Sequence, residues 1–147
     1  MLVSMRDSGQ ALSQVDIEEL EKEIGAKFPG DYKNFLATYN GGRPTPKRFM
    51  VDGFDDEPRQ VLDFFGLYDQ VESCNIDWNY RILSARISGL FVPIACEDSG
   101  NIVYISLLTS SYGNVFYWLH DFAMDAKSDA SYFVAESFSE FLNKLRD

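Results

Sequence analysis

The side chains in this sequence whose types and spacing could do chemistry are mainly carboxylates, grouped in two short polar segments. The first segment holds Asp52, Asp55, Asp56 and Glu57, and the second holds Glu97 and Asp98. Carboxylate oxygens bind hard cations such as Ca²⁺, but an EF-hand loop needs acidic residues at alternating positions and a glutamate at its end. Neither segment has that spacing. Both therefore read as acidic loops, either solvated turns or surfaces that recognise a basic partner.

The single histidine and the two cysteines do not form a recognisable catalytic or metal-binding pattern. A Ser-His-Asp or Cys-His system places histidine beside a nucleophile, whereas His120 stands between Leu119 and Asp121 at the end of an expected strand. Cys74 and Cys96 lack the short spacings of zinc ligands, and we expect free, partly buried thiols. The sequence predicts no catalytic residues, no metal and no cofactor, and hence a protein that is not an enzyme.

The overall charge restricts the kinds of partner that suit this chain. It has 147 residues, of which 13 are basic and 23 acidic, giving a net charge of −10. Nucleic acids and anionic membranes are poor partners, because binding them requires Lys and Arg to neutralise phosphates. We find no apolar run long enough for a membrane helix and no signal peptide, so we expect a cytoplasmic protein. The length fits one domain, residues 1–147.

Two helices are expected near the N-terminus, after a lead-in segment at residues 1–12. Ser13 suits an N-cap, and Gly25 ends the first apolar stripe. Pro29 suits the start of a second helix, and Asn40-Gly41-Gly42 suits its end rather than a phosphate loop, which would precede a helix. The stripes are Ile17, Leu20 and Ile24 in the first helix, and Tyr32, Phe35, Leu36 and Tyr39 in the second. Residues 21–23 are expected to be solvated.

The remaining segments read as strands and helices in an order typical of an α+β fold. Strands are expected over 49–51, 59–65, 90–96, 102–108 and 115–119, and helices over 72–84 and from Phe138 onward, where Ser137 and Glu140 suit a capping box. Residues 43–46 and 120–129 are expected to be loops. Pro93 is expected near the start of its strand or on an edge. Alternation places Phe116 and Trp118 on one face of a strand and Tyr117 on the other. Packing in the core on both faces explains these side chains most simply, and stacking on a base or ligand is the alternative. The order predicts a mainly antiparallel sheet with helices packed against it.

Five segments match one known family in their order and spacing. They are Ile17 to Gly25, Phe28 to Gly42 with its Pro, Asp-Tyr, Phe-Leu and Asn-Gly-Gly positions, Phe91 to Asn101, Gly113 to Trp118, and Ala135 to Leu142. Together they resemble the SUKH superfamily, whose best-known branch is the Smi/Knr cell-wall-regulator-like group. The resemblance covers roughly residues 13–146. It implies an α+β fold around a mainly antiparallel sheet, with no shared catalytic residues.

The resemblance also implies a function. Bacterial members commonly act as immunity proteins, which bind and block a polymorphic toxin, often a nuclease or deaminase. We therefore expect a non-catalytic module that binds a basic toxin domain, with Asp52, Asp55, Asp56, Glu57, Glu97 and Asp98 as candidate partner-binding residues. The alternative is a regulatory or scaffolding interaction domain of the Smi/Knr type. A small carboxylate-dependent hydrolase is a third, more remote reading.

Overall fold

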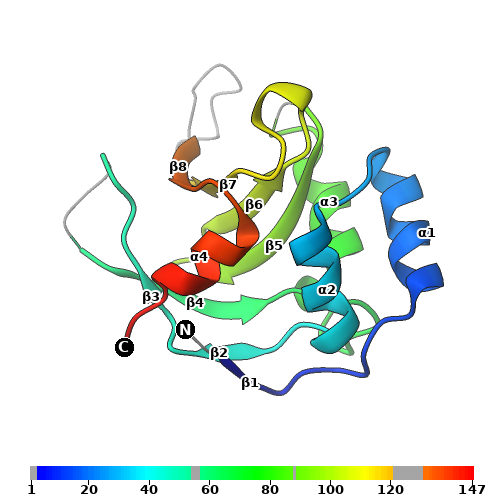
Figure 1. Ribbon diagram of the computed structural model, residues 1–147, viewed down its shortest axis with the longest axis horizontal. Coiled ribbons are helices and arrows are strands. Elements are labelled where there is room, and N and C mark those ends of the chain that lie inside the picture. Colours follow the sequence, from blue (N-terminus) through cyan, green and yellow to red (C-terminus); the bar gives the residue numbers. More distant parts are fainter. Residues whose placement is uncertain (1–2, 54–56, 88, 121–130) are drawn as a thin grey trace.

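A six-stranded antiparallel sheet forms the centre of the molecule, as the computed structural model shows (Figure 1). The structure describes residues 3–53, 57–87, 89–120 and 131–147. The strands lie in chain order across the sheet: β3 (Arg48–Phe49), β4 (Arg59–Phe64), β5 (Phe91–Glu97), β6 (Ile102–Ser106), β7 (Val115–Trp118) and β8 (Ser131–Ala135). A separate two-stranded ribbon pairs β1 (Ser4–Arg6) with β2 (Arg43–Thr45). The predicted α+β class is confirmed, and β5, β6 and β7 form an antiparallel meander.

Serine side chains cap two of the helices in the described part of the chain. Ser13 caps α1 (Gln14–Ile24) in a full capping box with Asp16, and Gly25 ends the helix at a φ of 97°. α2 (Gly30–Thr38) starts after Pro29, and Ser137 caps α4 (Phe138–Lys144) by accepting from the Glu140 backbone N–H. The predicted helix over 72–84 is a 3-10 turn, η1 (Glu72–Cys74), followed by α3 (Ile76–Leu83). A second 3-10 turn, η2 (Thr109–Ser111), precedes β7.

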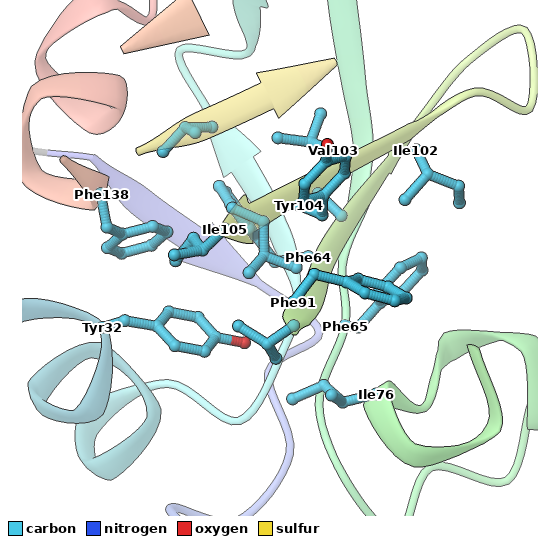
Figure 2. Close-up of a cluster of buried hydrophobic side chains, with 14 of the residues drawn as sticks. Tyr32, Phe64, Phe65, Ile76, Phe91, Ile102, Val103, Tyr104, Ile105 and Phe138 are labelled. Carbon is cyan, nitrogen blue, oxygen red and sulfur yellow. The ribbon is translucent and has the colours of Figure 1, made fainter. Parts of the chain in front are cut away.

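One face of the sheet packs against α2 and α4 through aromatic rings. Phe138 of α4 lies 5.1 Å from Tyr32, 4.8 Å from Phe35 and 6.0 Å from Phe64 of β4, measured between ring centroids. Figure 2 shows Tyr32 and Phe138 pointing into the same cluster as Phe64 and Ile105 of the sheet. The Asp31 carboxylate accepts hydrogen bonds from the Ser139 backbone N–H and hydroxyl, which fixes α4 to the start of α2. These contacts explain why the Asp-Tyr and Phe-Leu positions of α2 matter to the fold.

The opposite face carries a row of rings that starts at α3. Tyr80 of α3 lies 5.4 Å from Phe91, which lies 5.5 Å from Tyr104, and Tyr104 lies 5.4 Å from Phe116. Tyr117 instead packs 6.0 Å from Phe49 in the core of the other face. The predicted alternation of Phe116 and Tyr117 is therefore confirmed. Helices thus cover both faces, with α1 and α2 side by side at the right of Figure 1 and α3 behind them.

Several local predictions are wrong, and tertiary contacts explain why. No element is predicted from the sequence over residues 131–135, yet β8 pairs there with β7 and forms an edge of the sheet. Residues 43–45 form β2 rather than a loop, because β1 in the lead-in segment pairs with them. Pro93 is the third residue of β5, near the start of its strand as predicted, and it is buried there, with a register shift between Pro93 and Ala95. Glu21 is buried rather than solvated, because its carboxylate accepts the Phe28 backbone N–H at 2.6 Å.

Candidate protein-binding surface

The structure brings three of the predicted acidic side chains to one end of the sheet. Because β4 and β5 are antiparallel, the segment entering β4 and the turn leaving β5 lie side by side, with Val61 opposite Glu97. The Asp98 backbone N–H donates to the Gln60 carbonyl at 3.1 Å, which joins the two segments. Asp52, Glu57 and Asp98 are exposed there. Asp55 and Asp56 lie outside the residues that the structure describes.

Glu97 does not belong to that exposed surface, contrary to the sequence prediction. The residue is only 1% exposed. Its Oε1 accepts hydrogen bonds from the Ser99 N–H at 2.9 Å, the Asn101 N–H at 3.3 Å and the Asn101 side-chain amide at 3.0 Å. Burial raises the pKa of the Glu97 carboxyl, and the adjacent Asp98 carboxyl raises it further. Glu97 therefore shapes the β5–β6 turn rather than contacting a partner.

The single histidine belongs to the same buried network. Asn101 donates through Nδ2 to Glu97 and to the Tyr117 hydroxyl, so its Oδ1 faces His120. The His120 backbone N–H and ring Nδ1 lie 3.0 and 2.7 Å from that oxygen. The ring nitrogen must therefore donate its proton to Asn101, which places His120 in a structural role at the end of β7.

The two thiols are free in the structure and lie partly buried. Burial raises the pKa of the Cys96 thiol to about 11 and also raises that of Cys74. Both side chains are thus protonated at neutral pH, and a protonated thiol is a weak nucleophile. Across the described ranges, no three His, Cys, Asp or Glu side chains gather in a way that could hold a metal ion. No helix in those ranges is long and apolar enough to cross a membrane.

A second acidic region lies between α1 and α3, where no site is predicted from the sequence. Three hollows of about 420, 390 and 110 Å³ adjoin one another there, and Tyr68 lines all three. Six carboxylate residues and one arginine complete the charged lining: Asp16, Glu19, Glu23, Asp69, Glu72, Asp77 and Arg81. We call this region the α1–α3 acidic face. Its excess of carboxylates suits a positively charged partner.

Helix α1 contributes a row of carboxylates to this face. Asp16, Glu19 and Glu23 stand at i, i+3 and i+7, which places them on one side of the helix. The Ser13 backbone N–H, the Tyr68 hydroxyl and the Ser13 hydroxyl donate to Asp16 and lower the pKa of its carboxyl, so the group stays ionised. Glu23 holds Arg81 of α3 through two 2.9 Å hydrogen bonds. The row of carboxylates joins α1 to α3 and gives the α1–α3 acidic face much of its negative charge.

Tyr68 stands at the centre of the α1–α3 acidic face in an unusual conformation. Its φ is 65°, a left-handed value that bulky side chains rarely adopt. The residue is 72% exposed, and its hydroxyl donates to Asp16 at 2.8 Å. Trp78 lies beside it in the largest of the three hollows, and the Trp78 indole N–H donates to Glu72. A large aromatic side chain held in solvent is typical of a contact residue.

Two asparagines hold the backbone on either side of Tyr68. The Asn40 side chain accepts from the Leu67 N–H at 2.7 Å and donates to the Leu67 carbonyl at 2.9 Å. The Asn75 side chain accepts from the Asp69 N–H at 2.8 Å and donates to the Asp69 carbonyl at 3.0 Å. Both asparagines are buried. We call these two pairs of bonds the asparagine clamps.

The Asn40-Gly41-Gly42 segment serves this arrangement rather than only ending a helix. α2 ends at Thr38, and Asn40 reaches the loop around Leu67. A Cβ on Gly41 would lie 2.9 Å from the Phe64 carbonyl, and a Cβ on Gly66 would lie 2.2 Å from Asn40 Oδ1. Glycine is therefore required where the two segments meet. The i, i+3, i+7 acidic spacing in α1 was the one signal in the sequence that could have located this face.

Comparison with known proteins defines the class to which this fold belongs. A family model described as SMI1-KNR4 cell-wall (SUKH_6) matches residues 14–142. The chain therefore belongs to the SMI1-KNR4 family, which confirms the resemblance seen in the sequence.

Two relatives come from Bacillus subtilis (strain 168). The SPbeta prophage-derived uncharacterized protein YokK is 28% identical over 147 residues, covering 89% of this chain and 73% of that protein. The uncharacterized protein YnaB is 26% identical over 98 residues, covering 67% of this chain and 60% of that protein.

Proposed function

We propose that this protein is a non-catalytic binding module that neutralises a basic toxin domain by stoichiometric association. The observation that carries the proposal is the α1–α3 acidic face, where six carboxylates and one arginine surround an exposed tyrosine. Nuclease-type toxins present Lys and Arg to their own phosphate-containing substrate. An acidic protein covering those side chains blocks the substrate and needs no turnover.

Charge acts at two stages of such binding. The net charge of −10 accelerates encounter with a basic protein, because complementary fields steer diffusion. Close pairs then slow dissociation, with coupling energies of about 1.5–7 kcal/mol for pairs desolvated at an interface. The exposed acids at the end of the sheet, Asp52, Glu57 and Asp98, form a second candidate contact region for the same partner. The two regions are separable by substitution.

The test is co-expression with the product of the adjacent gene, scored by cell survival and co-purification. Rescue together with a stable complex supports neutralisation. A triple variant of the acidic face, Glu19→Gln, Glu72→Gln and Asp77→Asn, is expected to weaken rescue. The matched control, Asp52→Asn, Glu57→Gln and Asp98→Asn, removes the same charge at the end of the sheet. If only the control lost rescue, the sheet-end loops would be the contact region.

The second candidate function is a regulatory or scaffolding interaction domain, favoured by the family description as SMI1-KNR4 cell-wall. It predicts an adjacent gene product that is not toxic and forms no complex. Affinity purification of the tagged full chain would then recover a partner that the cell keeps active. An active bound partner distinguishes this function from neutralisation, in which the bound partner is inhibited.

A further inference from the structure

We infer that Tyr68 is a preorganised anchor that receives an arginine side chain of the binding partner. The inference deepens the proposed function, on which it rests for the basic nature of the partner. The group bound is the guanidinium of arginine rather than the ammonium of lysine. The contact is made by Tyr68 itself rather than by the charge of the surface in general.

The first step is that the Tyr68 ring is available and fixed. It is 72% exposed, and it lines all three hollows. Its hydroxyl is bound to Asp16, which itself belongs to the capping box of α1. The face of a tyrosine ring attracts cations, and arginine uses this contact more often than lysine. A ring fixed at its hydroxyl end offers that face without further ordering.

The second step is that the backbone carrying Tyr68 is held on both sides. The asparagine clamps fix Leu67 through Asn40 and Asp69 through Asn75, each with a donated and an accepted bond. The left-handed φ of 65° at Tyr68 persists because its neighbours are held in this way. A contact residue ordered before binding loses less conformational entropy on association. Asn40 and Asn75 are thus positioning residues for the anchor.

The third step is that the surface already binds one guanidinium, its own. Arg81 makes two parallel 2.9 Å hydrogen bonds to Glu23 and lies 3.5 Å from Asp77. Such fork-shaped pairing needs the planar guanidinium, which an ammonium group cannot reproduce. Glu19 and Asp77 line the hollow beside Tyr68 and offer the same carboxylate chemistry to a second arginine. Ring and carboxylates together select arginine over lysine.

The test uses the full chain with two peptide probes of equal charge, hexa-arginine and hexa-lysine, each acetylated and amidated at its ends. Isothermal titration gives both affinities, and the indole N–H resonance of Trp78 reports binding at the hollow it shares with Tyr68. Trp118 is buried and serves as the reference signal. We expect hexa-arginine to bind about threefold tighter or more, with a shift at Trp78.

Three variants decide the matter. Tyr68→Ala is expected to abolish the preference for arginine and leave lysine binding nearly unchanged, whereas Tyr68→Phe keeps the ring and most of the preference. The control Glu136→Gln with Asp147→Asn removes two charges at exposed positions outside both candidate contact regions and keeps the preference. Equal binding of the two peptides, or an unchanged preference in Tyr68→Ala, overturns the inference. A protein that prefers arginine but rescues no toxin rejects only the proposed function.

The positioning role has its own readout. Asn75→Ala is expected to speed hydrogen exchange of the Asp69 amide and to reduce the arginine preference, while hexa-lysine binding is unchanged. Asn40→Ala is the second variant, with the Leu67 amide as its reporter. A folded variant with rapid exchange at these amides and an undiminished arginine preference would show that the clamps do not prepare the anchor.

Discussion

Tyrosine residues occupy opposite environments in this protein, and each has a consequence that can be measured. Tyr68 is exposed in a strained backbone conformation, whereas Tyr32 is buried with its hydroxyl unpaired among the described residues. Burial raises the pKa of the Tyr32 hydroxyl well above its usual range. Neither arrangement favours stability. At Tyr68, the strained conformation places an exposed ring where a partner can contact it. At Tyr32, the aromatic packing against Phe138 outweighs the lost hydrogen bond.

Replacing Tyr68 with glycine is expected to leave the unfolding free energy unchanged or to raise it by up to about 1 kcal/mol. Glycine adopts positive φ without strain, and this relief offsets the lost hydrogen bond to Asp16. Urea denaturation measures the change. Gly113→Ala is the matched opposite substitution, since it adds a side chain at a φ of 89° and is expected to lower stability. A loss of more than 1 kcal/mol in Tyr68→Gly would contradict the strain argument.

Tyr32→Phe is expected to raise the unfolding free energy by about 1 kcal/mol. The substitution removes a buried hydroxyl that lacks a partner and keeps the ring contacts with Phe28 and Phe138. Tyr117→Phe provides the comparison, because the Tyr117 hydroxyl accepts from Asn101 at 2.8 Å and its loss is expected to destabilise by a similar amount. Thermal and urea unfolding of the two variants should therefore move in opposite directions.

Glu97→Gln is expected to make stability less dependent on pH. The folded state raises the pKa of Glu97 above its ordinary 4.5, so its contribution is fully present below that value and is lost as pH rises through the folded pKa. Glutamine keeps an oxygen for the Ser99 and Asn101 donors and cannot ionise. The variant should gain stability relative to wild type between pH 4 and pH 8, measured by urea denaturation. A constant difference across that range would show that Glu97 does not titrate this way.

At the level of elements, the Asn40 side chain joins the segment after α2 to the loop after β4. Asn40→Ala is expected to lower the unfolding free energy by about 2–4 kcal/mol, because the Leu67 N–H and carbonyl both lose their partner in a buried setting. Thr38→Ala, an exposed change nearby, is expected to alter it by less than about 0.5 kcal/mol. Urea denaturation of both variants gives the comparison.

Local sequence signals predicted the elements that local interactions stabilise. The first helix was placed from Ser13 to Gly25, because its capping box and left-handed glycine depend on neighbouring residues. β8 could not be found in this way, because its pairing partner in β7 alone makes it a strand. The register shift beside Pro93 could not be found for a related reason, since it is a property of the assembled sheet. Contacts distant in sequence decided each of these cases.

The same limit applied to the candidate site. The net charge indicated that a partner would be positively charged, and the acidic loops were the clusters of carboxylates visible in the sequence. However, Glu97 is buried, and the α1–α3 acidic face was not predicted. That face combines Asp16 of α1 with Tyr68 of a loop and Asp77 of α3, and Asp16 and Tyr68 are 52 residues apart in the sequence. Only the tertiary fold assembles them. The strained φ of Tyr68 likewise has no local signature, because tyrosine is a poor choice for that conformation.

At the level of the whole molecule, the charge of −10 predicts a strong salt dependence of association. The association rate with the partner recovered by co-expression is expected to fall about tenfold or more between 20 and 500 mM salt, since steering is screened beyond a few ångströms at high salt. The dissociation rate should change less, because close pairs are partly desolvated. Stopped-flow mixing measures the first rate and surface plasmon resonance the second. An association rate independent of salt would show that charge does not guide encounter.

The asparagine clamps have a consequence for how such a protein diverges. The Asn40 side chain bonds to main-chain atoms of Leu67, and the Asn75 side chain bonds to main-chain atoms of Asp69, Val71 and Glu72, so neither bonds to the side chain at position 68. Proteins that descend from one ancestor can therefore change the residue at position 68 by a single mutation and keep the backbone conformation of the loop. A library randomised at position 68, together with positions 19 and 72, should yield folded proteins with new specificities at a high rate.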